Sequence, residues 1–130
     1  MADPQAPASS RWRILLVDDC VDDAELTAIE LRNAGFDFEL LRVDREAPLL
    51  RALPDFAPQL VLSDLNMPGF SGRQAFVLVR EHAPQARFVF LTGAVEENAG
   101  LPEADAVLLK QELHSLPALV RRLLGNPAET

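Results

Sequence analysis

Five polar side chains each follow an apolar run, and their types are those that bind divalent cations and neutralise anions. Two adjacent acids end ILLVDD, one acid ends LVLSD, a threonine ends FVFLT and a lysine ends AVLLK. Three carboxylates brought into one cleft repel each other unless a cation joins them, and Mg²⁺ prefers such oxygen ligands. A neighbouring lysine would add a second positive charge. The residues are Asp18, Asp19, Asp64, Thr92 and Lys110.

The apolar runs alternate with helical patterns along the chain. Short continuous apolar runs predict buried strands, and a partly alternating run predicts a strand nearer an edge. The predicted strands are 13–17, 36–43 (nearer an edge), 60–63, 87–91 and 106–109. Helices are predicted from Asp22 or Asp23 to Gly35, over 46–56, from Ser71 to Pro84 and from Ser115 to Gly125. This alternation predicts an α/β fold, a parallel sheet covered by helices on both faces.

The predicted sheet explains how distant polar residues could meet. In open α/β sheets, ligands bind beyond the carboxyl ends of the strands. Asp18 and Asp19 follow the first strand, Asp64 the third, Thr92 the fourth and Lys110 the fifth. All five therefore belong to the same edge of the sheet, a convergence more specific than any one of them alone.

Two further acids, Asp22 and Asp23, stand at the start of the first helix. Asp is a good N-cap residue, and its charge is favourable at a helix N-terminus. We expect Asp22 and Asp23 to contribute that helix charge and nothing more.

Length and charge limit the classes of function. A chain of 130 residues fits one domain, predicted over 12–125, with a disordered arm at 1–11 and a tail at 126–130. The net charge of -8 argues against binding nucleic acid, which needs clustered basic residues. No apolar run reaches the roughly 20 residues of a membrane span, so no membrane insertion is expected. The single cysteine excludes an internal disulfide and favours a cytoplasmic location.

Four segments together resemble one known family. ILLVDDCVDD, LVLSDLNMPGFSG, FLTG and VLLK match the receiver domain of two-component response regulators, and the resemblance runs from about Arg13 to Leu124. It implies a flavodoxin-like, doubly wound sheet of five strands in the order 2-1-3-4-5. It also implies that a histidine kinase or histidine phosphotransfer protein hands a phosphoryl group to Asp64.

The resemblance also suggests a role for each site residue. We assign Mg²⁺ to Asp19 and Asp64 directly, to Asp18 through water, and to the backbone carbonyl of Asn66. Lys110 would neutralise the phosphoryl oxygens, and the Thr92 hydroxyl would bond one of them and move toward it. Phosphoryl transfer needs mainly such positioning and charge neutralisation. The chain is then not an enzyme for a separate substrate, since only its own phosphorylation and hydrolysis are implied.

Two positions and the length of one segment depart from the usual receiver pattern. Gln111 follows the lysine where proline is common, and with GAVEEN this resembles the receivers found near PAS-containing sensor proteins. Val107 stands where an aromatic switch residue is common. The segment from Thr92 to Lys110 is shorter than in most receivers. The fourth helix must therefore fit within 95–101 and is expected to be short or irregular. We therefore expect the family's common dimer face to be altered, and the protein to be a monomer or weak dimer.

Several functions remain open at this point. We expect no output domain, so the protein would signal through a downstream protein partner, and the first and last helices are available for the kinase. A pseudo-receiver would bind proteins without taking phosphate. An aspartyl-phosphate phosphatase of the haloacid-dehalogenase type would need an acid where Asn66 stands. A dinucleotide-binding domain would need a glycine-rich turn after the first strand, which is missing.

Overall fold

The computed structural model describes residues 11–65, 67, 69–93 and 104–124, and it shows one five-stranded parallel sheet. The predicted order β2-β1-β3-β4-β5 is confirmed, with β2 at an edge. The predicted helix within 95–101 and the predicted ligand Asn66 lie outside the described residues. The elements are β1 (Trp12–Val17), α2 (Val21–Asn33), β2 (Phe38–Val43), α3 (Glu46–Asp55), β3 (Leu60–Asp64), α4 (Gly72–His82), β4 (Arg87–Thr92), β5 (Ala106–Leu109), the 3₁₀ helix η2 (Lys110–Ser115) and α5 (Leu116–Leu124).

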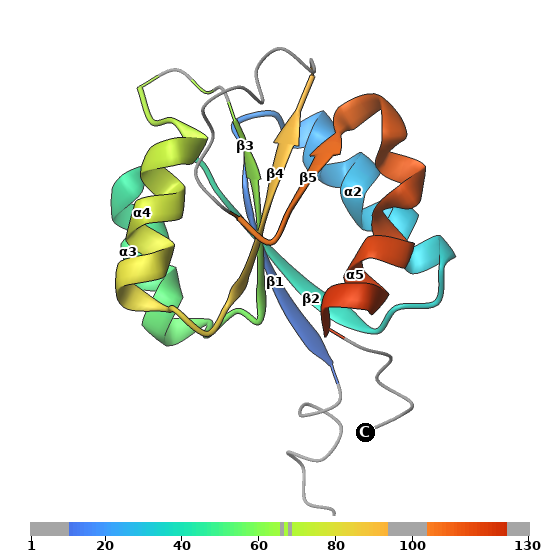
Figure 1. The fold of residues 1–130 in the computed structure, drawn as a ribbon, viewed down its shortest axis with the longest axis horizontal. Helices are drawn as coiled ribbons and strands as arrows, with labels where there is room; N and C mark the ends of the chain where they lie inside the picture. Colours follow the sequence, from blue (N-terminus) through green and yellow to red (C-terminus); the bar gives the residue numbers. More distant parts are fainter. Residues whose placement is uncertain (1–10, 66, 68, 94–103, 125–130) are drawn as a thin grey trace, which may run out of the picture.

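Helices cover both faces of the sheet. Figure 1 shows α3 and α4 on one side of the strands and α2 and α5 on the other. The residues of β1 alternate between the two layers, as the two-residue period of a strand requires. Leu15 and Val17 join the core under α3 and α4, whereas Ile14 and Leu16 join the core under α2 and α5. The continuous apolar run is thus explained by burial on both faces.

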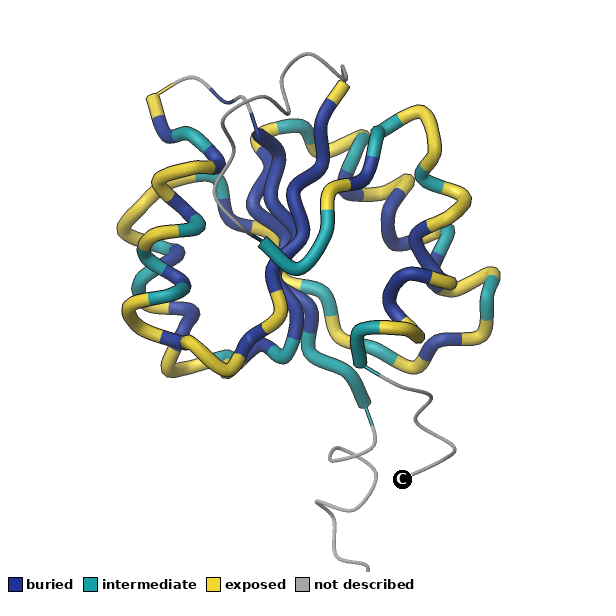
Figure 2. The backbone as a smooth tube through the Cα atoms, viewed as in Figure 1, coloured by how far each residue is buried: buried dark blue, intermediate teal, exposed yellow. Residues whose placement is uncertain are grey.

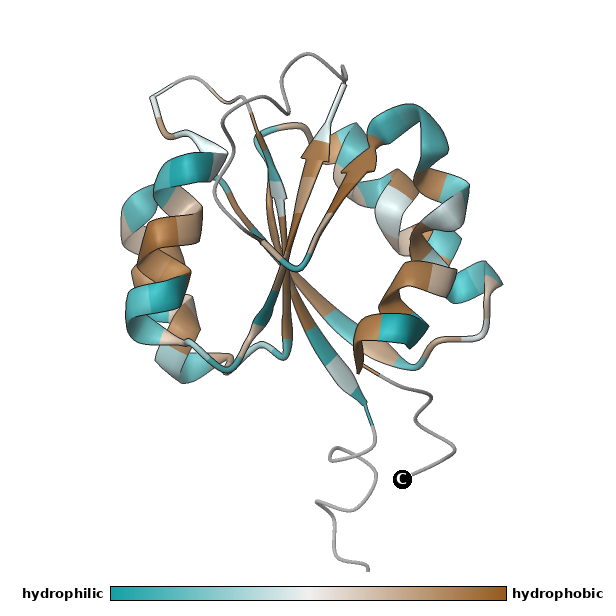
Figure 3. Ribbon diagram, viewed as in Figure 1, coloured by the Kyte–Doolittle hydropathy of each residue, from teal (hydrophilic) through white to brown (hydrophobic). Residues whose placement is uncertain are grey.

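The central strands form the most buried part of the molecule. All residues of β3 are buried, and β4 is buried from Phe88 to Thr92. Figure 2 shows the buried residues concentrated along the strands, with exposed residues on the outward sides of the helices. Figure 3 shows hydrophobic residues concentrated on the same strands. A polar side chain at the end of β3 or β4 is therefore held by a rigid apolar layer.

Helix α4 begins close to the carboxyl end of β3. Ser71 and Gln74 form a reciprocal capping box, in which each side chain binds the other residue's backbone N–H. A Cβ on Gly72 would lie 2.5 Å from the carbonyl oxygen of Asp64, so only glycine allows this approach. The start of α4 is thus packed directly against the backbone of Asp64.

Some local predictions need correction. Helix α2 begins at Val21 with Cys20 as its N-cap, so Asp22 and Asp23 lie in the first turn instead of capping it. The 3₁₀ helix η2 was not predicted, because its residues show no 3.6-residue apolar pattern. Arg11, assigned to the disordered arm, binds Asp37 at 3.0 Å and the carbonyl oxygen of Phe38 at 3.2 Å. Of the helices in the described ranges, none is long and apolar enough to span a membrane.

Candidate functional site

Three carboxylates converge where β1 and β3 end. Asp18 and Asp19 follow β1, and Asp64 is the last residue of β3. Each offers an oxygen atom, and these three atoms all lie within 4.8 Å of one another. Asp18 is 1% exposed and Asp64 is 8% exposed, whereas Asp19 is exposed. The fold therefore brings together the three acids that the sequence singled out.

Lys110 lies against this cluster. Its Nζ is 3.3 Å from Oδ2 of Asp64 and 3.7 Å from Oδ2 of Asp18. It also donates a hydrogen bond of 2.9 Å to Oδ2 of Asp23, in the first turn of α2. Lys110 is the only lysine in the sequence, since every other basic residue besides the two histidines is an arginine. One ammonium group thus contacts carboxylates from three parts of the chain.

The electrostatics of the site depend on burial and on this ammonium. Burial raises the pKa of Asp18, although the backbone N–H of Cys20 and the charge of Lys110 act in the opposite direction. Burial would lower the pKa of Lys110, but its hydrogen bond to Asp23 and the charges of Asp18 and Asp64 outweigh that and raise it. Lys110 is therefore a fixed cation at neutral pH. Asp18 is a desolvated carboxylate whose charged form would gain from a further cation.

The donor set fits a hard divalent ion. Three carboxylates at one edge of a sheet supply the oxygen ligands that Mg²⁺ prefers, and the exposed Asp19 leaves space for the waters that Mg²⁺ keeps. One ammonium cannot neutralise three acids and Asp23 as well. Asp18, Asp19 and Asp64 therefore suit a divalent metal ion, whereas the other predicted ligand, Asn66, lies outside the described residues.

Thr92 lies at the same edge of the sheet. It is the last residue of β4 and is fully buried, and it pairs with Leu109, the residue before Lys110. In the neighbouring ladder, Asp64 pairs with Leu91. Thr92 thus follows directly after the residue opposite Asp64.

Two residues that contact the site were missed by sequence reasoning. Asp23 was assigned to helix charge alone, yet it binds Lys110. Arg42 of β2 donates a hydrogen bond of 3.0 Å to the backbone carbonyl of Asp18. A chain with one lysine and twenty acids carries a signal for the first contact, but no sequence pattern indicates the second.

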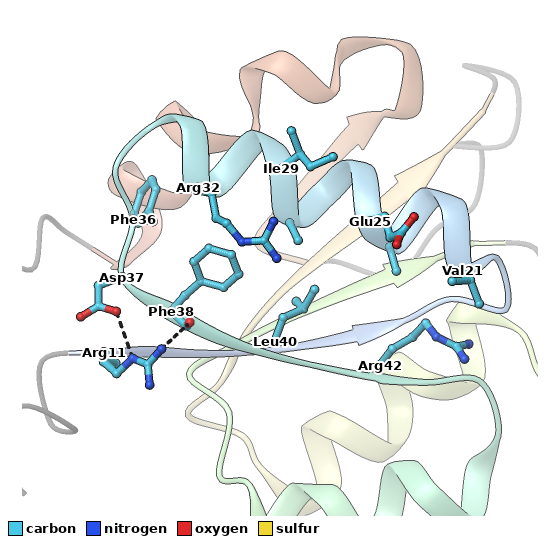
Figure 4. Close-up of a pocket in the computed structure, with 12 residues that line it drawn as sticks. Arg11, Val21, Glu25, Ile29, Arg32, Phe36, Asp37, Phe38, Leu40 and Arg42 are labelled. Carbon is cyan, nitrogen blue, oxygen red and sulfur yellow. Dashed lines mark hydrogen bonds and ion pairs between the residues drawn. The ribbon is translucent and has the colours of Figure 1, made fainter.

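A groove between α2 and β2 lies beside the site and is shown in Figure 4. Phe36, Phe38 and Leu40 form part of its wall, and Arg32 points into it in that view. Arg42 also lines the groove and is its link to the acidic cluster.

Comparison with known proteins decides the family. The model of the response regulator receiver domain matches residues 14–114. The chain belongs to this family. The DNA-binding response regulator MtrA of Mycobacterium tuberculosis is 35% identical over an alignment of 127 residues that covers 92% of this chain and 55% of MtrA. This receiver chain therefore spans about half the length of the curated relatives it matches.

Two solved structures have a similar fold. The response regulator TrrA of Thermotoga maritima, crystallised in complex with Mg²⁺ and BeF, is 28% identical, with a TM-score of 0.76 over 87% of this chain and 99% of TrrA. The receiver domain of a sensor histidine kinase from Pseudomonas aeruginosa holds a magnesium ion in its active site cleft. At 21% identity and a TM-score of 0.75, over 89% of this chain and 99% of that domain, it shows a shared fold.

Proposed function

We propose that this receiver domain accepts a phosphoryl group on Asp64 from a histidine kinase or a histidine phosphotransfer protein. The observation that carries the proposal is the convergence of Asp18, Asp19 and Asp64 within 4.8 Å, with the Lys110 ammonium 3.3 Å from Asp64. A nucleophilic carboxylate, a set of metal ligands and a fixed cation are the parts that phosphoryl transfer requires.

The proposed reaction is a displacement at phosphorus. A carboxylate oxygen of Asp64 attacks the phosphorus of the donor's phosphohistidine, and the P–N bond breaks as the new P–O bond forms. The imidazole leaves with the electron pair of the broken bond and takes up a proton from water, so that it departs in the neutral form. Lys110 stays charged and pairs with a phosphoryl oxygen. The Thr92 hydroxyl donates a hydrogen bond to another phosphoryl oxygen and shifts toward it, which is the proposed switch.

Metal binding completes the charge balance. Asp19 and Asp64 would hold Mg²⁺ directly, with Asp18 acting through water and Asn66 through its backbone carbonyl. A bound ion would neutralise charge on the phosphoryl oxygens and orient them for in-line attack. Burial of Asp18 and Asp64 keeps their oxygens in fixed positions for that purpose.

We expect the signal to be read by proteins. The exposed residues Val21, Leu26 and Ile29 give α2 an apolar surface suited to a partner, and α5 lies next to α2. The net charge of -8 favours protein partners over nucleic acid for this part of the chain. MtrA is a DNA-binding regulator by name, so a gel-shift assay should test whether this chain itself binds DNA. We expect no shift of the DNA band.

Mass spectrometry of the intact protein tests phosphorylation. Incubation with Mg²⁺ and acetyl phosphate is expected to add the mass of one phosphoryl group to the wild type. Asp64→Asn should add none, while Asp22→Asn, which changes an exposed acid outside the cluster, should add as much as the wild type. An unmodified wild type under these conditions would favour the pseudo-receiver alternative. Steady turnover of a small phosphate ester would instead favour the phosphatase.

A further inference from the structure

The shortest ion pair of Lys110 is with Asp23, a residue outside the cluster of Asp18, Asp19 and Asp64. Its 2.9 Å contact with Asp23 compares with 3.3 Å to Asp64 and 3.7 Å to Asp18. Asp23 and Lys110 are 87 residues apart in sequence, so this bond joins the first turn of α2 to the start of η2. It is a tertiary contact, not a local feature of the helix.

The backbone leaves the Lys110 side chain dependent on such contacts. The ladder between β4 and β5 ends at the pair Thr92 and Leu109, so Lys110 is the first residue beyond the paired sheet. A lysine side chain is long and loses considerable rotamer freedom when it is fixed. The direction of the ammonium is therefore set by the anions around it.

Those anions compete for one charge. If Asp23 were neutral, the charged partners left to Lys110 in the described ranges would be Asp18 and Asp64. Both are also candidate ligands of Mg²⁺. We propose that Asp23 is a positioning residue that draws Lys110 toward α2 and so leaves the oxygens of Asp18 and Asp64 available to a divalent cation. This inference rests on the metal site of the proposed function.

Asp22 separates this role from the effect of helix charge. Both acids lie in the first turn of α2, where either would interact favourably with the helix dipole. Asp22 is exposed and has no hydrogen bond or ion pair within the part of the chain that the structure describes, whereas Asp23 binds Lys110. Replacing each acid with asparagine removes the same charge from the same turn. Asp22→Asn is therefore a matched control for Asp23→Asn.

A double-mutant cycle on Mg²⁺ affinity tests the inference by calorimetry. Asp23→Asn is expected to weaken Mg²⁺ binding about tenfold, within the range of coupling between charged residues in contact. Asp22→Asn should weaken it by no more than about twofold, because only a screened long-range charge is lost. In a Lys110→Ala background, the effect of Asp23→Asn should fall to a few-fold or less. Equal effects of Asp23→Asn with and without Lys110 would show that Asp23 acts by charge alone and would overturn the proposal.

A second measurement detects the contact without metal or phosphate. Because Lys110 is the only lysine, labelling with lysine that carries ¹³C at Cε alone gives a single lysine side-chain signal in an NMR spectrum. We expect that signal to shift in Asp23→Asn, to return toward the wild-type position in Asp23→Glu, and to stay unchanged in Asp22→Asn. An identical signal in the wild type and Asp23→Asn would mean that the contact does not form in solution. If the cycle and the signal behave as expected but Asp64 takes no phosphate, the proposed function fails and the positioning role of Asp23 stands.

Discussion

Asp105, just before β5, is the residue whose loss should most clearly change how stability depends on pH. Its carboxylate accepts hydrogen bonds from the backbone N–H of Phe88 at 2.8 Å, from Arg80 at 3.2 Å and from Arg87 at 3.3 Å. These contacts tie α4 and the start of β4 to the residue before β5. Asp105→Asn keeps the size of the side chain and an acceptor for Phe88, but it removes the charge that both arginines share.

The magnitude follows from the two charged hydrogen bonds. The side chain of Asp105 is 20% exposed, so the pairs are only partly screened. Hydrogen bonds to charged groups contribute about 1.5–3 kcal/mol each, and partial exposure with loss of one charge favours a total near 2 kcal/mol at pH 7. Burial raises the pKa of Asp105, but the bonds from Phe88, Arg80 and Arg87 outweigh it and lower the pKa below its ordinary value of 3.8.

The sign of the pH effect is then fixed. Because the folded state holds Asp105 deprotonated more strongly than the unfolded state does, its contribution is complete above pH 3.8. The contribution is lost as the pH falls through the lower, folded pKa. Urea unfolding of the wild type and Asp105→Asn should therefore show a difference at pH 7 that shrinks as the pH falls below 3.8. Asp55→Asn, at an exposed acid of α3, is the control. A difference that stays constant with pH would refute the charge-based explanation.

Two further substitutions test the packing and the charge of the site. Gly72→Ala places a Cβ 2.5 Å from the carbonyl oxygen of Asp64 and should lower the free energy of unfolding by about 1–3 kcal/mol. A Cβ at Gly93 would have no heavy atom within 4 Å, so Gly93→Ala should lower the free energy of unfolding by less than about 1 kcal/mol. Urea titration measures both changes. Asp18→Asn removes a desolvated carboxylate and should raise the free energy of unfolding by roughly 1 kcal/mol without Mg²⁺. Thermal unfolding should show that Mg²⁺ stabilises the wild type more than this variant; a variant stabilised as much as the wild type would exclude Asp18 from the metal site.

The fold was predictable because its strongest signals are local. The apolar runs that became β3 and β4 are buried on both faces, so they contain no alternating pattern that could be misread. The partly alternating run of β2 matched its place at the edge of the sheet. Asp18, Asp19, Asp64 and Lys110 could be grouped because strand ends of a parallel sheet share one edge.

What could not be predicted depends on side-chain direction. Asp22 and Asp23 have the same type and the same turn, and only the three-dimensional arrangement shows that one of them reaches Lys110. In α2, the apolar Val21 is 54% exposed, whereas the polar Thr27 is buried. Sequence patterns do not fix helix boundaries to the residue, and they do not show how far the neighbouring elements cover each side chain of a helix.

The two basic residue types differ in where they lie: arginines hold segments of the fold together, whereas the single lysine lies at the acidic cluster. Arginines in this chain bind carbonyl oxygens and hold segments together: Arg13 binds Ala57, Arg80 binds Ala86 and Arg121 binds Ala34. A guanidinium is a planar fork that suits such fixed, directional contacts, whereas an ammonium is a compact charge whose three donors can face several acids at once. The position that must contact Asp23, Asp64 and Asp18 from one point holds the single lysine. Under the proposed function, Lys110 would exchange one carboxylate partner for a phosphoryl oxygen, and the lack of directional preference of an ammonium suits that exchange.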